Sequence, residues 1–443
     1  MTPRPPPQSL SPASEAQQHL YAHLKLQPEV ALAYQFSACL RFDGPLDADT
    51  LERALARVVA RHEALRTGFV EQDGVLCRAF APDARVALER VEADAPGDAD
   101  GVARRHMAEL TGAPLELGKA PLLRVRLLRL GPEHHGLCVS VHHLVWDAWS
   151  WWVFVRDLAA FYNEQTGGSP AALPVLSEER EAFGAEAVRA AALAYWRRQL
   201  AAPLPLTEVL PTLPRPARRL HPAGFVRATP RDEVGRAVQR LALRTRSSPF
   251  IVMLAAFKVL LSRYTGQTDL MVGAPLHGRS EWARDRIGYF VEVAALRTRL
   301  EQAVTFRAVV EQVREAVLAA REHGPGPSTP FRIMFMFRDV SIRGDEFQGL
   351  RVRLEEASKP AAKFELTLAL QPTPAGYAAE MEYDAQLYEP GFADQLLRHY
   401  LRLLEATLSA PDAPLTALTP LEPDEQLKLL RRWNETAEPS PAA

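Results

Sequence analysis

Two adjacent histidines, followed closely by an aspartate, form the part of the sequence best suited to chemistry. They lie in the segment HHLVWDAWS, which begins with His142 and His143 and includes Asp147. Near neutral pH, a neutral imidazole can accept a proton or hold a reacting group by a hydrogen bond. A histidine pair taken alone is more often structural than catalytic, so the residue types leave both interpretations open.

The residues before the histidines decide which way the two rings point. The run LCVSVHHLV, residues 137–145, predicts a buried strand. Because side chains alternate along a strand, we expect His143 to share a face with Val139 and Val141, and His142 to point the other way. Neighbouring strand positions cannot bind one metal ion from the same face, so the pair does not indicate a zinc site. Asp147 can pair with an arginine or orient a histidine ring.

Helices and strands mix without a regular rhythm along the rest of the chain, which predicts an α+β fold in two lobes. Apolar spacing predicts one helix from Leu51, capped by Asp49 or Thr50, and another from Trp151, capped by Ser150. The second half opens with a helix that is apolar almost all round and therefore buried. The later elements are strands over residues 269–275, 331–337, 363–370 and 377–383 and a helix over residues 392–408.

Composition places the chain among ordinary globular proteins. Its 443 residues suffice for two large domains, and 47% hydrophobic residues supply their cores. The formal net charge of −2 gives no sign of a nucleic-acid or anionic-membrane partner. No run of about 18 apolar residues predicts a membrane span. The Pro-rich N-terminus does not suit a signal peptide, and three cysteines without CxxC spacing fit a reducing cytoplasm.

The complete motif, HHxxxD followed by a small residue and WS, resembles the active-site motif of nonribosomal peptide synthetase condensation domains. Other segments resemble that family in the same order: SEAQQHLY (14–21), RHEALRTGF (61–69), ALAYWRRQL (192–200), TGQTDLMVGAPLHGR (265–279) and IGYFVEVAALR (287–297). LLRRWNETAEPSP (429–441) is similar to the linker that leads into an adenylation domain. The resemblance covers nearly the whole chain.

The resemblance implies two lobes related to chloramphenicol acetyltransferase, arranged as a V-shaped pseudodimer with a tunnel between them. Donor and acceptor carrier proteins would each present a thioester on a phosphopantetheine arm, and the acceptor amine would attack the donor carbonyl to form an amide. The domain would bind no cofactor itself, and its partners would be the two carriers and an adenylation domain. The expected parts are a flexible Pro-rich lead-in (1–12), an N-terminal lobe (13–180), a C-terminal lobe (181–425) and a linker (426–443).

The resemblance also assigns roles to residues. His143 matches the catalytic histidine, either as a general base or as a partner that positions the amine. His142 and Asp147 match structural positions, and the expected ion-pair partner of Asp147 is Arg279, with Arg66 as the second candidate. Ala148 and Ser150 are expected to support the site. Four side chains are candidates to line the tunnel, with core packing as the favoured alternative for the second and the fourth: Trp146, Tyr289, Glu292 and Trp196.

Two departures from the family pattern bear on the substrate. Ala148 stands where the family usually has glycine. If the backbone there has a positive φ, alanine costs energy; if not, its methyl group narrows the channel beside His143. Glu292 stands in place of a usual amide side chain and brings a carboxylate near the tunnel. These departures leave the identity of donor and acceptor open.

Other functions within this fold remain as alternatives. An epimerisation domain shares HHxxxD but carries an EGHGRE-like segment, which this sequence lacks. A heterocyclisation domain has aspartate at the position of His142. A non-catalytic recruitment module usually loses the second histidine or the aspartate, and this sequence keeps both. A standalone acyltransferase that uses coenzyme A thioesters is disfavoured by the adenylation-type linker.

Overall fold

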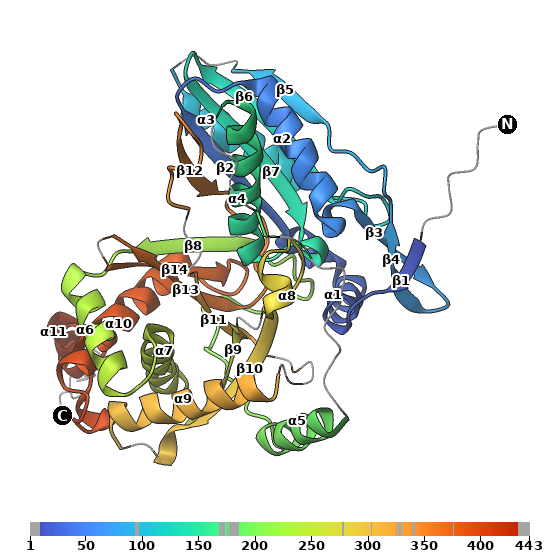
Figure 1. Ribbon diagram of the computed structural model, residues 1–443. Coiled ribbons are helices and arrows are strands. Elements are labelled where there is room, and N and C mark those ends of the chain that lie inside the picture. Colours follow the sequence, from blue (N-terminus) through green and yellow to red (C-terminus); the bar gives the residue numbers. More distant parts are fainter. Residues whose placement is uncertain are drawn as a thin grey trace, which may run out of the picture.

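The computed structural model describes residues 9–93, 97–167, 173–174, 176, 186–276, 279–302, 304–324, 326, 329, 331–338, 342–374 and 376–432. The predicted α+β fold in two lobes is confirmed, with the N-terminal lobe above the C-terminal lobe in Figure 1. Residues 1–8 of the expected lead-in lie outside the described residues. Ser9–Pro12 form strand β1, which pairs with β4 (Val75–Phe80), so a flexible segment was the wrong prediction there.

A five-stranded sheet of order β12-β2-β7-β6-β5 forms the N-terminal lobe. Alternation along β7 confirms the predicted strand as far as His142. Leu137 and Val141 pack with helices α2 and α4, whereas Cys138 packs with α3 on the opposite face. The bounds are β2 Gln35–Asp43, β5 Leu88–Glu92, β6 Leu123–Gly131, β7 His134–His142, β12 Arg351–Glu356, α2 Ala48–Arg61, α3 Ala99–Gly112 and α4 Ala148–Gln165. A small sheet, β1-β4-β3 (β3 Thr67–Gln72), and helix α1 (Glu15–Leu26) flank it.

Helices α2 and α4 begin earlier than the apolar spacing predicts. Their N-caps are Asp47 and Asp147, whose carboxylates accept hydrogen bonds from backbone N–H groups of the first turn. The predicted caps were wrong because apolar spacing marks the first buried residue, and the helix starts ahead of it. Those predicted caps were Asp49 or Thr50 for α2 and Ser150 for α4.

A six-stranded sheet of order β10-β9-β11-β13-β14-β8 forms the C-terminal lobe, and helices α6, α7, α9 and α10 cover one of its faces (Figure 1). Phe335 and Leu368 point into the core beneath these helices. Met334 and Thr367, one position earlier on the same strands, line the space between the lobes instead. The bounds are β8 Ala223–Ala228, β9 Asp269–Leu276, β10 Glu292–Arg299, β11 Ile333–Phe337, β13 Leu366–Thr373, β14 Gly376–Asp384, α6 Asp232–Arg244, α7 Pro249–Thr265, α9 Phe306–Glu322 and α10 Pro390–Ser409.

One segment of the C-terminal half crosses to the other lobe. β12 pairs antiparallel with β2, and Phe347 and Val352 are buried in the N-terminal core. Without β12, strand β2 would be an edge with unpaired backbone groups. The prediction that residues 181–425 form a separate C-terminal lobe is therefore wrong for this segment.

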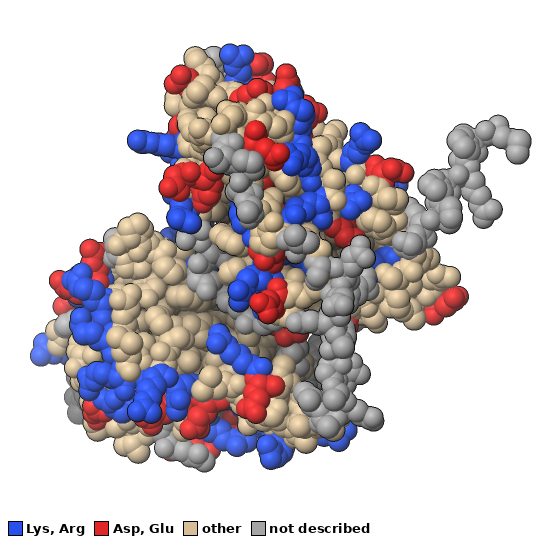
Figure 2. All heavy atoms as spheres, in the orientation of Figure 1, with Lys and Arg blue, Asp and Glu red and all other residues tan. Residues whose placement is uncertain are grey.

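The surface shows charged residues of both signs on both lobes and an indentation between them (Figure 2). Within the described ranges, no single helix is long and apolar enough to cross a bilayer. Only α6 and α7 taken together, bent by 103° at their junction, meet that requirement by length and composition.

Candidate active site

A cavity of about 1870 Å³ lies between the two lobes. Tyr34 and His143 line it from the N-terminal lobe, and Tyr289, Glu292 and Lys363 line it from the C-terminal half. Among the residues that the structure describes, no group of three or more His, Cys, Asp or Glu side chains could hold a metal ion. Of the titratable groups at the cavity, His143 is the one that belongs to the HHxxxD motif.

His143 lies just beyond the strand on which we expected it. β7 ends at His142, and His143 begins a 3₁₀ turn that ends at Val145. Its Nδ1 lies 2.6 Å from the backbone carbonyl oxygen of Trp146. Because a carbonyl oxygen can only accept a hydrogen bond, Nδ1 carries the proton and Nε2 keeps its lone pair. This tautomer suits a group that accepts a proton at Nε2.

The surroundings of His143 keep its imidazole uncharged. The ring packs against Phe36, Tyr289 and Tyr34, at centroid distances of 4.5, 4.8 and 5.9 Å. Burial, and then the charge of Lys363, lower the pKa of His143 well below its ordinary value. The ring is therefore neutral at physiological pH, as proton acceptance requires.

His142 has different contacts. Its Nδ1 accepts a hydrogen bond of 3.2 Å from the backbone N–H of Leu144 and so caps the turn that carries His143. Burial, and then the charge of Lys363, lower the pKa of His142 to about 4. Its side chain is buried and does not line the cavity. The two rings differ in surroundings as predicted, and these contacts support a structural role for His142.

Asp147 joins the two halves of the chain. Its Oδ1 lies 2.6 Å from Nη2 of Arg279, so the predicted ion pair is present. The two side chains are 4% and 9% exposed, respectively, so the pair is buried. Arg66, the second candidate, instead donates to backbone carbonyls within the N-terminal lobe. The sequence therefore predicted the correct partner, and the alternative is wrong.

Three side chains of the N-terminal lobe accept hydrogen bonds from backbone N–H groups in the segment 287–290 of the C-terminal half. The pairs, at 3.3, 3.1 and 3.1 Å, are His62 with Ile287, Ser150 with Gly288, and Asp147 with Phe290. We call these contacts the latch. Because Tyr289 lies within the latched segment, the latch places its ring against His143. His62 was not predicted as a site residue, and its only signal in the sequence is its place in the RHEALRTGF motif.

Two of the four predicted tunnel residues line the cavity. Tyr289 and Glu292 do so. Burial raises the pKa of Tyr289 to about 12, and it also raises the pKa of Glu292. Trp146 is fully buried in the N-terminal core, so it was wrong as a tunnel residue. Trp196 is buried in the C-terminal core, which confirms the core packing that was favoured for it. Their large apolar rings contribute more by packing than by facing a polar cavity.

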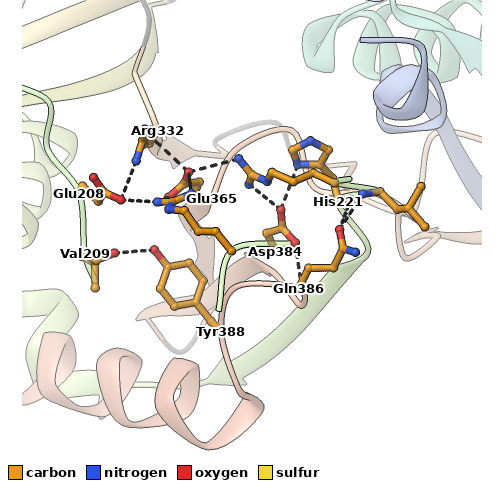
Figure 3. A network of polar contacts seen from close by, with 11 residues as sticks. Glu208, Val209, His221, Arg332, Glu365, Asp384, Gln386 and Tyr388 are labelled. Carbon is orange, nitrogen blue, oxygen red and sulfur yellow. Dashed lines mark hydrogen bonds and ion pairs between the residues drawn. The ribbon is translucent and has the colours of Figure 1, made fainter. Parts of the chain in front are cut away.

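A network of ion pairs stabilises one wall of the cavity (Figure 3). Asp384 pairs with Arg219 at 2.7 Å and with His221 at 3.0 Å, and Glu365 lies 3.4 Å from Arg219. Both carboxylates are buried, and they tie residues 208–221 to strands β13 and β14. Arg219, His221 and Glu365 line the cavity. No motif in the sequence indicated this network, because its members come from distant segments.

Ala148 is the first residue of α4, and its side chain lines the cavity. Its φ is not positive, so alanine adds a methyl group without backbone strain. We expect Ala148→Gly to keep the fold, with stability changed by no more than about 1 kcal/mol. The wider channel should increase the relative rate with bulky acceptors, measured by competition between a small and a large acceptor. Ala148→Val should shift the preference the other way, and unchanged preference in both variants would show that residue 148 does not restrict the channel.

Comparison with known proteins identifies the family. A family model described as Condensation domain matches residues 8–430, and the chain therefore belongs to the condensation domain family. The chain is 32% identical to the probable non-canonical nonribosomal peptide synthetase CymA of Salinispora arenicola, over 99% of this chain and 6% of that protein. It is 31% identical to phosphinothricin tripeptide synthetase PhsB of Streptomyces viridochromogenes, over 97% of this chain and 38% of that protein. The chain thus spans a minor part of these relatives, and the predicted resemblance to nonribosomal peptide synthetases is confirmed.

Solved structures agree with this assignment. The first condensation domain of the calcium-dependent antibiotic synthetase, in complex with a substrate analogue, matches with a TM-score of 0.78 and 25% identity, over 93% of this chain and 99% of that one. The X-domain from teicoplanin biosynthesis matches with a TM-score of 0.77 and 25% identity, over 94% and 99%. An X-domain in complex with OxyB matches with a TM-score of 0.76 and 25% identity, over 95% and 99%. These neighbours support the family and the fold. Because they include both condensation domains and X-domains, they do not distinguish between the roles that these domains have.

Proposed function

We propose that the chain catalyses amide-bond formation between a donor acyl thioester and an acceptor aminoacyl thioester, each carried on the phosphopantetheine arm of a carrier protein. The observation that carries this proposal is the unprotonated Nε2 of His143, in a cavity lined by both lobes. Membership of the condensation domain family supports the same class of reaction. The partners in this proposal are an upstream donor carrier, a downstream acceptor carrier and an adjoining adenylation domain.

In the proposed reaction, the acceptor amine attacks the carbonyl carbon of the donor thioester. The C–N bond forms, and the amine gives a proton to Nε2 of His143. The C–S bond then breaks, and the departing thiolate of the donor arm takes that proton from His143. An amine is already a good nucleophile towards a thioester, so the correct orientation of the amine contributes together with proton transfer.

The test uses two carriers, one loaded with N-acetylalanine as donor and one with alanine as acceptor, and then pairs with larger side chains. We expect intact-protein mass spectrometry to show the acyl mass leaving the donor carrier and appearing on the acceptor carrier. Free alanine should be a poor acceptor, because the arm supplies the binding energy that orients the amine. Transfer no faster than in the absence of the chain, for every pair, would contradict the proposal.

Recruitment of another protein is a second candidate, favoured by the likeness to the X-domain solved in complex with OxyB. A recruitment module would bind the loaded carriers or a further enzyme without acyl transfer.

An epimerisation domain would instead exchange the α-hydrogen of a carrier-bound residue. Deuterium uptake from heavy water by a single loaded carrier, without an acceptor, would therefore favour epimerisation over condensation.

A further inference from the structure

A second charged group faces the reaction centre from the C-terminal lobe. Lys363 precedes β13 and lines the cavity. Its Nζ lies 4.4 Å from the ring centre of Tyr34 and 4.6 Å from that of Phe36, both on the N-terminal side. At these distances a cation is attracted to the aromatic faces. Lys363 is therefore held between the lobes by rings that also contact His143.

Lys363 differs from the other lysine nearby. Lys359 pairs with Glu382 at 3.2 Å. In the described part of the chain, the ammonium of Lys363 has no hydrogen-bond or ion-pair partner, although it is partly buried. A partly buried ammonium without an acceptor keeps its hydrogen-bond donors free for a bound molecule.

Lys363 and His143 contact the same aromatic ring and line the same cavity. The centre of the Phe36 ring lies 4.5 Å from that of the His143 imidazole and 4.6 Å from Nζ of Lys363. A base lies about 3 Å from the amine whose proton it takes. A donor that stabilises an oxyanion lies about 2.7–3.1 Å from that oxygen. Because both groups contact the ring of Phe36 and line one cavity, a substrate in that cavity can meet His143 with its amine and Lys363 with its carbonyl oxygen.

We propose that Lys363 is a second catalytic residue, whose ammonium stabilises the oxyanion that forms on the donor carbonyl while His143 takes the proton from the amine. This inference rests on the proposed condensation. When the C–N bond forms, the carbonyl π electrons move onto oxygen, and the ammonium offsets that negative charge. When the C–S bond breaks, the carbonyl re-forms and Lys363 is unchanged. The two catalytic groups come from different lobes, so the site is complete only when the lobes are together.

The burial and the titratable groups around Lys363 set the pH range in which it is charged. Lys359 and Glu382 face it from the C-terminal lobe. The titratable groups near it in the N-terminal lobe are His142, His143, Tyr34 and His23. Burial, and then Lys359, lower the pKa of Lys363, and Glu382 opposes them. A lowered pKa means that Lys363 loses its charge at a lower pH than an exposed lysine does.

The first test removes the charge at constant length. Lys363→Met should lower kcat for the alanine carrier pair by about 10²–10³-fold with little change in KM, as expected for loss of one oxyanion donor. Lys363→Arg should restore most of the rate, because arginine keeps the charge. Lys359→Met is the matched control and should change the rate far less. Melting temperatures of all variants separate loss of folding from loss of chemistry, and a folded Lys363→Met chain with the unmutated kcat would overturn the inference.

The pH profile supplies a second, independent signature. The unmutated rate should fall at high pH as Lys363 loses its proton, and Lys363→Arg should abolish that fall. A nearby cation disfavours the imidazolium, so Lys363→Met should raise the pKa of His143 and move the low-pH fall of the rate to higher pH. The same acceptor in every variant keeps the contribution of its amine constant.

Nuclear magnetic resonance titration of ¹³C-labelled histidine, with His143→Ala for assignment, measures the pKa of His143 without turnover. An unmutated chain that transfers no acyl group would contradict the proposed condensation and, with it, the oxyanion role. An active unmutated chain together with an unchanged kcat in folded Lys363→Met would contradict the role of Lys363 alone, whatever the pKa of His143.

Discussion

His143→Ala should slow acyl transfer between loaded carriers by about 10²–10⁴-fold, the usual value of general acid–base catalysis. The chain should stay folded, because the ring lies at the cavity and water can replace it at the carbonyl of Trp146. If His143 acts as a base, the unmutated rate should fall only below the lowered pKa of its imidazole. If His143 mainly positions the amine, the loss should be smaller and should vary with the acceptor.

His142→Ala is the matched control for this prediction. Its ring is buried and caps the turn through Leu144, so its removal should lower the melting temperature. We thus expect His143→Ala to lose activity and keep a stable fold, and we expect His142→Ala to lose stability. Transfer at the unmutated rate by His143→Ala would contradict the catalytic assignment and favour the recruitment function.

Asp147→Ala should reduce the free energy of unfolding by about 3–5 kcal/mol, because it leaves the buried charge of Arg279 without its partner. The loss includes the N-cap of α4, which is worth about 1 kcal/mol in typical helices. The side chain of Asp147→Asn can still accept the hydrogen bond from the backbone N–H of Ser150, but it lacks the charge. The stability of this variant should therefore lie between that of the unmutated chain and that of Asp147→Ala. Activity should fall as well, since the latch that places Tyr289 beside His143 loses one of its three contacts.

The control for the ion pair is an exposed one. Arg90 pairs with Asp49 and Glu52 on the surface, where all three side chains are more than a third exposed. Arg90→Ala should leave the melting temperature almost unchanged, as exposed ion pairs contribute little. An Asp147→Ala chain as stable as Arg90→Ala would show that the buried pair does not hold the lobes.

Local periodicity and motif order predicted much of the fold. Alternation placed Val141 and His142 on opposite faces, and the resemblance to the condensation domain family predicted that Asp147 pairs with Arg279, although the two residues are distant in sequence. Periodicity reports only which side of an element is apolar. It could not show that the ring of Trp146 fills a core rather than a channel, because both surroundings suit an aromatic residue.

Contacts that depend on assembled surfaces could not be predicted from the sequence. The sequence predicted Lys363 as the first residue of a strand. Its contacts with the rings of Tyr34 and Phe36 form only when the C-terminal lobe packs against the N-terminal lobe. The network of Asp384 and Glu365 also joins distant segments whose pairing has no local signature. Whether Ala148 has a positive φ could not be decided from the sequence. The structure shows that it does not, because Ala148 lies in the first turn of α4.

The crossing of β12 has a consequence for how the protein is made. During synthesis the N-terminal portion usually folds first. Here the sheet that carries His143 stays incomplete until residue 356 has left the ribosome, because β12 supplies its last strand. Until then β2 remains an open edge, and the apolar ring of Phe42 lacks its contact with Phe347. The two lobes are thus not separate folding units, and the catalytic histidine gains its final support only after much of the second lobe has been translated.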